Sequence, residues 1–574
     1  MLISPCLPAS PLILTAESVP VLSIMSPTLL RRPQLNPWTV GVLLVAFFIA
    51  IPILFIVASV FAETGDIWQH LVTTVLPEYL QHSFTLMIGV GVGVAVIGVG
   101  SAWLVTLCRF PGSGIFEWAL LLPLAAPAYL LAYTYTHLLD FFGPVQTGLR
   151  ALFGWVSVND YWFPEIRNIW GAIAMLILVL YPYVYLLVRV AFLEQATGML
   201  EASRCLGCNP WRSFFTVALP LARPAIASGV ALVLMETLGD FGTVQYFGVT
   251  TFTTGIYRTW FGMGERLAAA QLAAVLMSFI AVLILLERLS RSQARYYESS
   301  AGFQAPAKHE LSGVRSLLAI VACLLPITFG FIVPAVYLVY LTIANRDYTL
   351  NQSFWDIAQN SLILAVISAI LASAIALFLA YGQRQGKSRL LNFGVRISAM
   401  GYAIPGTVIA VGILIPVTRL DKAIDNWMRA TFDVSPGLLL SGTIIALIFA
   451  YLVRFLAVSF NAVESSLEKI KPSLDEASRS LGHSVGSTLF RIHTPLMSGG
   501  ILTAVMLVFV DVMKELPATL LIRPFNFDTL AVQVYQYASD ERLIEAAAPA
   551  LTIILVGIIP VIFLSFKIAR SRDY

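Results

Sequence analysis

The sequence is poor in charged residues. Only 12% of its 574 residues are Asp, Glu, Lys or Arg, whereas 58% are hydrophobic, and the mean hydropathy is +0.83. Soluble domains carry about 25% charged residues, so this chain lacks the polar surface that water would require. The composition excludes an ordinary soluble protein and predicts an integral membrane protein.

The signatures of several other classes are missing as well. The five cysteines are few and scattered, which excludes a disulfide framework. A formal net charge of +3 is too small to indicate a nucleic-acid partner. The six histidines have no zinc-ligand spacing, and Cys205-x-x-Cys208 is by itself weak evidence for a metal. We therefore expect no catalytic residue, no metal site and no cofactor bound by this chain.

A phosphate-binding loop is also lacking. The segment GQRQGKS at 382–388 resembles one, but only three residues separate Gly382 from Gly386, where the motif needs four. It also lies in a short basic stretch between apolar runs. The chain is thus not expected to be an enzyme, and any ATP hydrolysis it depends on is expected on a separate subunit.

What the chain has is long apolar runs of the length that crosses a bilayer. They divide into six and six, which predicts an all-α membrane protein with about twelve transmembrane helices. In the first half they lie at 38–62, 83–107, 115–139, 169–193, 219–246 and 267–287. In the second half they lie at 316–344, 361–381, 395–418, 438–460, 499–522 and 547–567. An even number of spans in each half predicts two parallel repeats.

The polar stretches between these runs predict the domain organisation and orientation. Residues 1–37 are expected to be a disordered tail, 38–290 and 316–574 two transmembrane domains, and 291–315 a cytoplasmic linker. Most of the 35 Lys and Arg residues fall on one side of the membrane if both termini are cytoplasmic. We therefore expect both termini in the cytoplasm.

A polar ten-residue segment, called the repeated phrase below, occurs twice in this hydrophobic chain. EASRCLGCNP at 201–210 and EASRSLGHSV at 476–485 stand 275 positions apart, in the loops after the fourth and tenth spans. Such a repeat indicates a duplicated domain. Ala202 and Leu206 are i,i+4 neighbours, as are Ala477 and Leu481, so each copy predicts a short helix with a small apolar stripe.

The end of each phrase predicts a sharp turn and a second helix. Gly207 and Gly482 suit the left-handed position just past a helix end. Asn209 and Ser484 stand where the next helix would need an N-cap. A short rigid projection of this kind suits docking into a soluble partner. The alternative is that each copy is an ordinary loop and that the similarity between the copies only reflects the duplication.

The phrase resembles a known family. Glu-Ala, then Leu-Gly, then Pro-Leu thirteen residues after the Gly, is similar to the EAA loop of ABC-importer permeases. In that family the loop forms a coupling helix that docks on an ATP-binding subunit. The resemblance implies eight coupling residues: Glu201, Ala202, Leu206, Gly207, Glu476, Ala477, Leu481 and Gly482. It also implies two ATP-binding subunits, an extracytoplasmic solute-binding protein and a place in the bacterial inner membrane.

The cargo is suggested by a narrower resemblance. The fused two-half layout, with GDFGTVQYFG at 239–248 and KELPATLLIRP at 514–524, is similar to that of ferric-iron permeases (FbpB/SfuB-like). Permeases for thiamine, putrescine or phosphonate-like solutes remain alternatives. From another class, so does a twelve-span secondary transporter that works without an ATPase.

Four acidic residues stand in apolar surroundings. In the register of the repeat Glu236 aligns with Asp511 and Asp240 with Glu515, so each half has an i,i+4 carboxylate pair on one face of the helix after its phrase. Intramembrane charges usually face the bundle interior or a wet cavity. We expect these four to line a cation pathway, with Lys514 neutralising the charge of Glu515. The alternative is a structural role, in which they lie near the outer membrane surface or pair with Lys514, Arg258 or Arg523. Further phenolic oxygens are available on Tyr246, Tyr535 and Tyr537.

Overall fold

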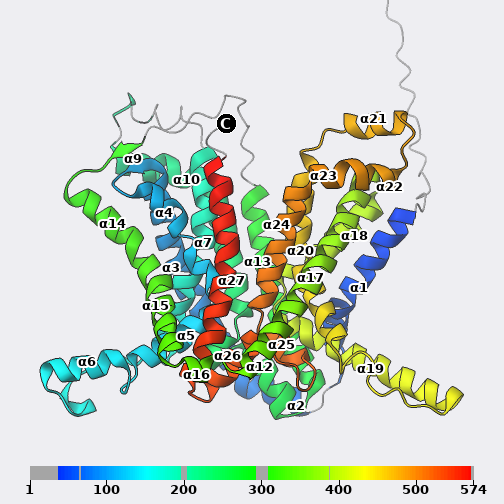
Figure 1. The fold of residues 1–574 in the computed structure, drawn as a ribbon, viewed down its shortest axis with the longest axis horizontal. Coiled ribbons are helices and arrows are strands. Elements are labelled where there is room, and N and C mark those ends of the chain that lie inside the picture. The colour runs from blue at the N-terminus through cyan, green and yellow to red at the C-terminus, as the bar shows by residue number, and fades with distance from the viewer. Residues whose placement is uncertain are drawn as a thin grey trace, which may run out of the picture.

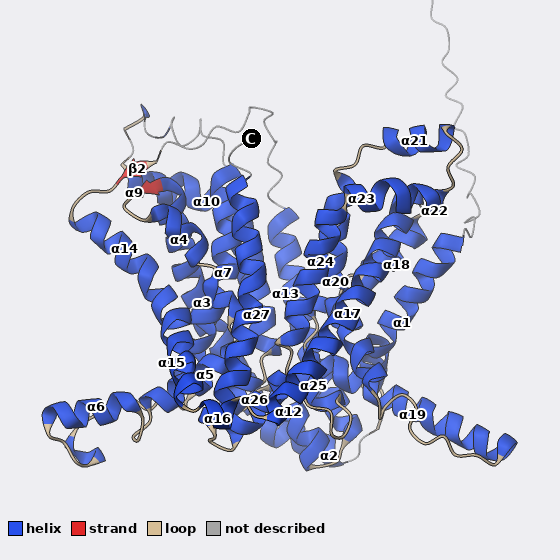
Figure 2. Cartoon of the chain, in the orientation of Figure 1, coloured by secondary structure: helices blue, strands red, loops and turns tan. Residues whose placement is uncertain are grey.

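The computed structural model describes residues 37–63, 66–194, 203, 205–207, 209–292, 308–386 and 388–570. These residues are almost wholly helical (Figure 2). Within them, nine single helices are long and apolar enough to cross a membrane, and three bent helix pairs bring the number of spans to as many as twelve. Each expected span falls on one such helix or pair, which confirms the six-plus-six division and the all-α class.

The first half runs through α1 (Pro37–Ser59), α2 (Asp66–His70), η1 (Leu71–Val75), α3 (Leu76–Leu107), α4 (Ser113–Ala119), η2 (Leu122–Ala125), α5 (Ala128–Leu139), α6 (Pro144–Phe153), η3 (Val158–Asp160), α7 (Ile169–Glu194), α9 (Pro210–Ser213), η4 (Phe214–Ala218), α10 (Leu219–Gly239), α11 (Gly242–Tyr246), α12 (Phe252–Tyr257), η5 (Arg258–Gly262) and α13 (Arg266–Ser292). Helices α3, α7 and α10 pack together as its core.

The second half runs through α14 (Val314–Ile327), η6 (Thr328–Ile332), α15 (Val333–Ala344), α16 (Arg346–Thr349), α17 (Gln352–Gln385), α18 (Arg389–Ser398), η7 (Gly401–Ala403), α19 (Gly406–Phe432), α20 (Ile444–Glu468), α21 (Ser473–Ser480), α22 (Val485–Thr488), η8 (Leu489–His493), α23 (Thr494–Leu496), α24 (Ser498–Met513), α25 (Pro517–Ile522), α26 (Leu530–Ser539) and α27 (Leu543–Arg570). Its core, α17, α20 and α24, repeats that of the first half.

The third span of each half is broken rather than continuous. The chain bends by 87° between Ala125 and Ala128 and by 117° between Ala403 and Gly406. In both cases a residue before proline takes an extended conformation, as at Ala126, because the proline ring disfavours the helical one there. Beyond the bends, α6 and the end of α19 project sideways from the bundle (Figure 1).

The first span of each half lies against the other half. Helix α1 packs on α18 and α19, and it also meets α17, where Trp38 stacks on Phe378 with ring centroids 5.0 Å apart. Helices α14 and α15 pack on α3, α4 and α5, where Tyr337 hydrogen-bonds His137 at 2.7 Å. In Figure 1, α1 flanks α18 on one side and α14 flanks α4 on the other. The two repeats are thereby interlocked.

The stretch between the halves is only partly described. Residues 1–36 and 293–307 lie outside the described residues, so the expected tail and most of the linker stay predictions. Where the chain is described again, β2 (His309–Glu310) pairs in parallel with β1 (Cys108–Arg109). Lys308 also contacts Glu117, which is paired with the buried Arg189 at 3.3 Å. The end of the linker is thus held on the first half.

Candidate functional site

The second copy of the repeated phrase forms a helix, a turn and a second helix, as predicted. Helix α21 ends before Gly482, whose φ is 82°. Ser484 caps α22 by accepting a hydrogen bond from the Ser487 amide at 3.2 Å. The predicted coupling positions Glu476, Ala477, Leu481 and Gly482 are all exposed, so an apolar side chain such as Leu481 is left uncovered by its own chain.

The first copy is described only in part. Gly207 has a φ of 83°, and Asn209 accepts a hydrogen bond from the Arg212 amide at 2.8 Å. The predicted turn and cap are thus confirmed here too. Leu206 is exposed, whereas Glu201 and Ala202 lie outside the described residues. No finding tests the coupling role of these residues in either half.

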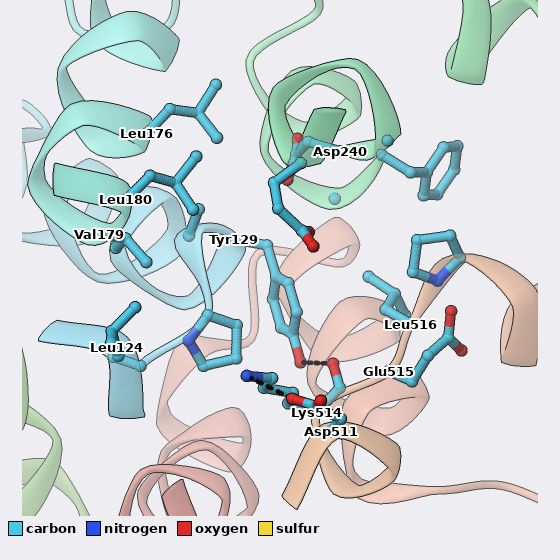
Figure 3. Close-up of a pocket in the computed structure, with 18 of the residues that line it drawn as sticks. Leu124, Tyr129, Leu176, Val179, Leu180, Asp240, Asp511, Lys514, Glu515 and Leu516 are labelled. Carbon is cyan, nitrogen blue, oxygen red and sulfur yellow. Dashed lines mark hydrogen bonds and ion pairs between the residues drawn. The ribbon is translucent and has the colours of Figure 1, made fainter. Parts of the chain in front are cut away.

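A cavity of about 140 Å³ lies between the two halves, and all four predicted carboxylates line it; Figure 3 labels Asp240, Asp511 and Glu515. The first half contributes Glu236 in α10 and Asp240 just after it, and the second contributes Asp511 in α24 and Glu515 just after it. Tyr129, just after the bend of the third span, projects between Asp240 and the Asp511–Lys514 pair. The duplication therefore brings both acidic pairs to one place.

The predicted placement of each pair on one helix face is wrong. Helices α10 and α24 end at Gly239 and Met513, so Asp240 and Glu515 lie beyond them. Asp240 accepts hydrogen bonds from the Thr243 and Val244 amides, both at 3.1 Å, at the start of α11. Because a carboxylate in this position satisfies otherwise unpaired amides, it ends one helix and caps the next.

Glu515 is used in the same way. It accepts hydrogen bonds from the amides of Ala518 and Thr519, both at 2.9 Å, at the start of α25. Its remaining charge is balanced by Arg454 at 3.0 Å. Lys514 does not neutralise Glu515, contrary to expectation; it pairs with Asp511 at 2.9 Å, one helical turn earlier. Asp240 and Glu515 thus carry the structural role that was the alternative for all four.

Glu236 differs from the other three carboxylates. It is half-buried, and within the described residues it has neither a hydrogen bond nor an ion pair. Taken together, the cavity lining carries four carboxylates against the two cations Lys514 and Arg454. The excess of negative charge makes the cavity favourable for a cation. No group of three or more His, Cys, Asp or Glu with metal-binding geometry occurs in the described part of the chain.

The sequence missed several residues of this cavity. Its phenols come from Tyr129, Tyr183 and Tyr402. The tyrosines named from the sequence lie elsewhere: Tyr246 contacts Arg167, Tyr535 packs on Phe241 and Tyr537 packs on Arg542. Tyr129 could have been found from Pro127 in the third span. The proline indicates a bend, and the residues after this bend lie along the cavity.

Comparisons with known proteins agree with the duplication. Residues 94–296 and 372–572 each match the family described as binding-protein-dependent transport system inner membrane component. The Fe(3+)-transport system permease protein FbpB 2 of Haemophilus influenzae is 27% identical over 549 residues, which are 93% of this chain and 98% of that protein. The ferric transport system permease protein FbpB of Actinobacillus pleuropneumoniae is 24% identical, over 92% of this chain and 78% of its own.

A shorter relative matches about a third of the chain. The molybdenum transport system permease protein ModB of Escherichia coli is 30% identical over 208 residues, which are 34% of this chain and 87% of ModB. The two matched family segments lie one in each half and together cover well over half of the sequence. The resemblance to fused two-half ABC-importer permeases is thereby confirmed, and the chain belongs to the family of inner membrane components of binding-protein-dependent transport systems.

Proposed function

We propose that this chain is the membrane-spanning permease of an ABC importer that carries ferric iron into the cytoplasm. The observation that carries the proposal is the net negative cavity shared by the two halves. Ferric iron is a hard cation that prefers oxygen ligands, as carboxylates and phenols supply. The relatives matched along most of this chain are named as ferric permeases. Permeases for thiamine, putrescine or phosphonate-like solutes are the alternatives.

The two copies of the repeated phrase would receive the ATP-binding subunits. Segments α9 and α21 lie at the same end of the molecule, together with the start of α1 and the end of α27 (Figure 1). We place this end and both termini in the cytoplasm, in agreement with the distribution of Lys and Arg. The exposed Leu206 and Leu481 would then each enter a groove of one ATP-binding subunit. ATP would be bound and hydrolysed there, and this chain would bind no cofactor.

The transport cycle would act through the walls of the cavity. We call the two copies of the repeated phrase the docking segments. The long helices that follow them, α10 and α24, carry Glu236 and Asp511 at their far ends. When the ATP-binding subunits draw together, the docking segments would move together and tilt these helices. The cavity would open alternately towards an extracytoplasmic binding protein and towards the cytoplasm.

Uptake into reconstituted vesicles tests this function. Vesicles that hold the chain, its ATP-binding subunit and its binding protein should take up ferric iron only when ATP is supplied. Thiamine, putrescine and a phosphonate are measured side by side, and preference for one of them would replace iron as the cargo. Transport by the chain alone, without an ATP-binding subunit, would identify a secondary transporter and overturn the importer.

The pathway is tested by removing the two aligned carboxylates of α10 and α24. The double variant Glu236→Ala with Asp511→Ala should abolish uptake while the ATP-binding subunit still co-purifies. The matched control is Asp356→Asn, an exposed carboxylate on α17 outside the cavity. Normal transport by the double variant would remove the pathway role and leave these carboxylates structural.

A further inference from the structure

The docking helix of the second half is held by an arginine from a distant transmembrane helix. Arg384, in the last turn of α17, donates to Oδ2 of Asp475 through Nε at 2.8 Å and lies 2.7 Å from it through Nη2. Asp475 directly precedes Glu476, and it is buried, whereas Glu476 is exposed. Helix α21 therefore turns one carboxylate towards the end of α17 and leaves the next one exposed.

The same end of α17 also holds the segments on either side of α21. Arg384 donates to the carbonyl oxygens of Leu467 at 2.8 Å and Ile470 at 2.9 Å, at the end of α20. Tyr381, one turn earlier, donates to the Val485 carbonyl at 2.9 Å, at the start of α22. The N–H groups of the Arg384 guanidinium thus reach both Asp475 in α21 and the segment that leads into α21. A lysine ammonium cannot reproduce this geometry.

A second buried group joins the cluster from the far side. The ring of His493, which is fully buried at the end of η8, lies with Nε2 3.1 Å from Oδ1 of Asp475. η8 leads into α24, whose end carries Asp511 and Lys514 in the cavity. Asp475 is thus the point where α17, α21 and the approach to α24 meet. We call Arg384, Asp475 and His493 the docking clamp.

The side chains of the docking clamp are not all repeated in the sequence of the first half. The residues 275 positions earlier are Arg109, Leu200 and Ala218, so the arginine is repeated, whereas Asp475 and His493 are not. Arg109 is 73% exposed and pairs with Glu310 of the linker at 3.9 Å. It therefore offers an exposed arginine for comparison with the largely buried Arg384.

We propose that Arg384 is a positioning residue that couples the second docking helix rigidly to the transmembrane core, so that a movement of this helix is transmitted to the transmembrane helices. The proposal rests on the proposed docking of α21 to an ATP-binding subunit. A charge-assisted, two-pronged contact holds its geometry better than neutral hydrogen bonds do. A displacement of α21 then moves α17 and α24 with it.

The direct test compares Arg384→Gln with the matched control Arg109→Gln in the complete importer. We expect Arg384→Gln to lower the amount of solute moved per ATP hydrolysed roughly tenfold, while the ATP-binding subunit still co-purifies and still hydrolyses ATP. Arg109→Gln should leave this ratio within about twofold of the unaltered importer. Equal ratios in the two variants would overturn the proposal.

A further, double variant guards against simple misfolding. Arg384→Gln leaves Asp475 buried without its partner, which is itself destabilising. The double variant Arg384→Gln with Asp475→Asn removes that buried charge, so it should recover thermal stability but not the transport ratio. Recovery of both would mean that the clamp only stabilises the fold. Failure of the unaltered chain to bind any ATP-binding subunit would instead refute the proposed function.

Spin labels test the clamp without any partner. Leu206 and Leu481 occupy equivalent places in the two copies and are 84% and 79% exposed. In a cysteine-free chain, Arg384→Gln should raise the mobility of a label on Leu481→Cys and leave that of a label on Leu206→Cys unchanged. Unchanged mobility at position 481 would contradict the clamp.

Discussion

The hydroxyl groups of Ser478 and Thr488 share a hydrogen bond of 2.7 Å across the turn that follows the second docking helix. The first half has the same bond between Ser203 and Ser213, at 3.1 Å, exactly 275 positions earlier in each case. Both partners are buried in each copy. The duplication has therefore kept an internal brace at this turn in both copies.

This brace predicts a local effect of Ser478→Ala. Losing one buried hydrogen bond should cost about 1 kcal/mol and speed amide hydrogen exchange in residues 481–488. The matched control is Ser480→Ala, two positions along the same helix, where the hydroxyl is exposed and only returns to its own helix at Glu476. Equal exchange in the two variants would show that the brace adds nothing.

The left-handed turn predicts a penalty for a side chain at Gly482. A Cβ there would meet no atom within 4 Å, so the cost of Gly482→Ala is conformational, about 1 kcal/mol. Gly486→Ala is the control, since this glycine lies in α22 without a positive φ and with equally open space. It should be neutral or slightly stabilising. Thermal unfolding in detergent measures both, and a loss at Gly486 as large as at Gly482 would contradict the argument.

Close packing of α3 on α7 predicts that Gly98 cannot be enlarged. A Cβ at this position would lie 2.7 Å from Cβ of Val184 and 3.0 Å from the backbone nitrogen of Tyr185. Gly98→Ala should therefore force the helices apart and destabilise the bundle by roughly 1–3 kcal/mol. Gly100→Ala, in the same helix with nothing within 4 Å, should have no such effect. An equal loss of folded protein in both variants would contradict the packing argument, because a Cβ at Gly100 meets no atom within 4 Å.

The buried pair in the cavity predicts a non-additive result. Arg454→Met leaves Glu515 buried without its cation and should cost about 3–5 kcal/mol. Adding Glu515→Gln should restore part of that loss, because the amide oxygen can still accept from Ala518 or Thr519. The exposed pair Arg542–Glu545 is the comparison, and Arg542→Gln should cost less than about 1 kcal/mol. Simple additivity at 454 and 515 would show that the two charges do not interact.

Much of the fold could be predicted because its signals are local. The twelve spans follow from the length of apolar runs. The turns at Gly207 and Gly482 follow from glycine itself, because this residue accepts a positive φ at little cost. The bend at Pro127 was equally visible, since proline constrains the residue before it. It was missed because hydropathy counts the two arms of a bent span as one run.

The site was predictable in its membership but not in its roles. The register of the repeat correctly brought Glu236, Asp240, Asp511 and Glu515 to one cavity. It could not tell which of them would cap a helix, because that depends on where each helix ends. Adjacency in the sequence also suggested Glu515 as the partner of Lys514, whereas the carboxylate within reach is that of Asp511, three residues earlier.

By itself, the sequence determined the class of this protein, its division into two parallel halves, the paired docking turns and the family. These depend on composition, on periodicity and on the intrinsic preferences of single residues. The tertiary structure alone decided the exchange of first spans between the halves, the arginine that balances Glu515 and the meeting of Arg384 with Asp475, 91 residues further along the chain. A buried charge takes its partner from whichever segments pack around it, and that packing joins parts of the chain whose separation in sequence carries no signal.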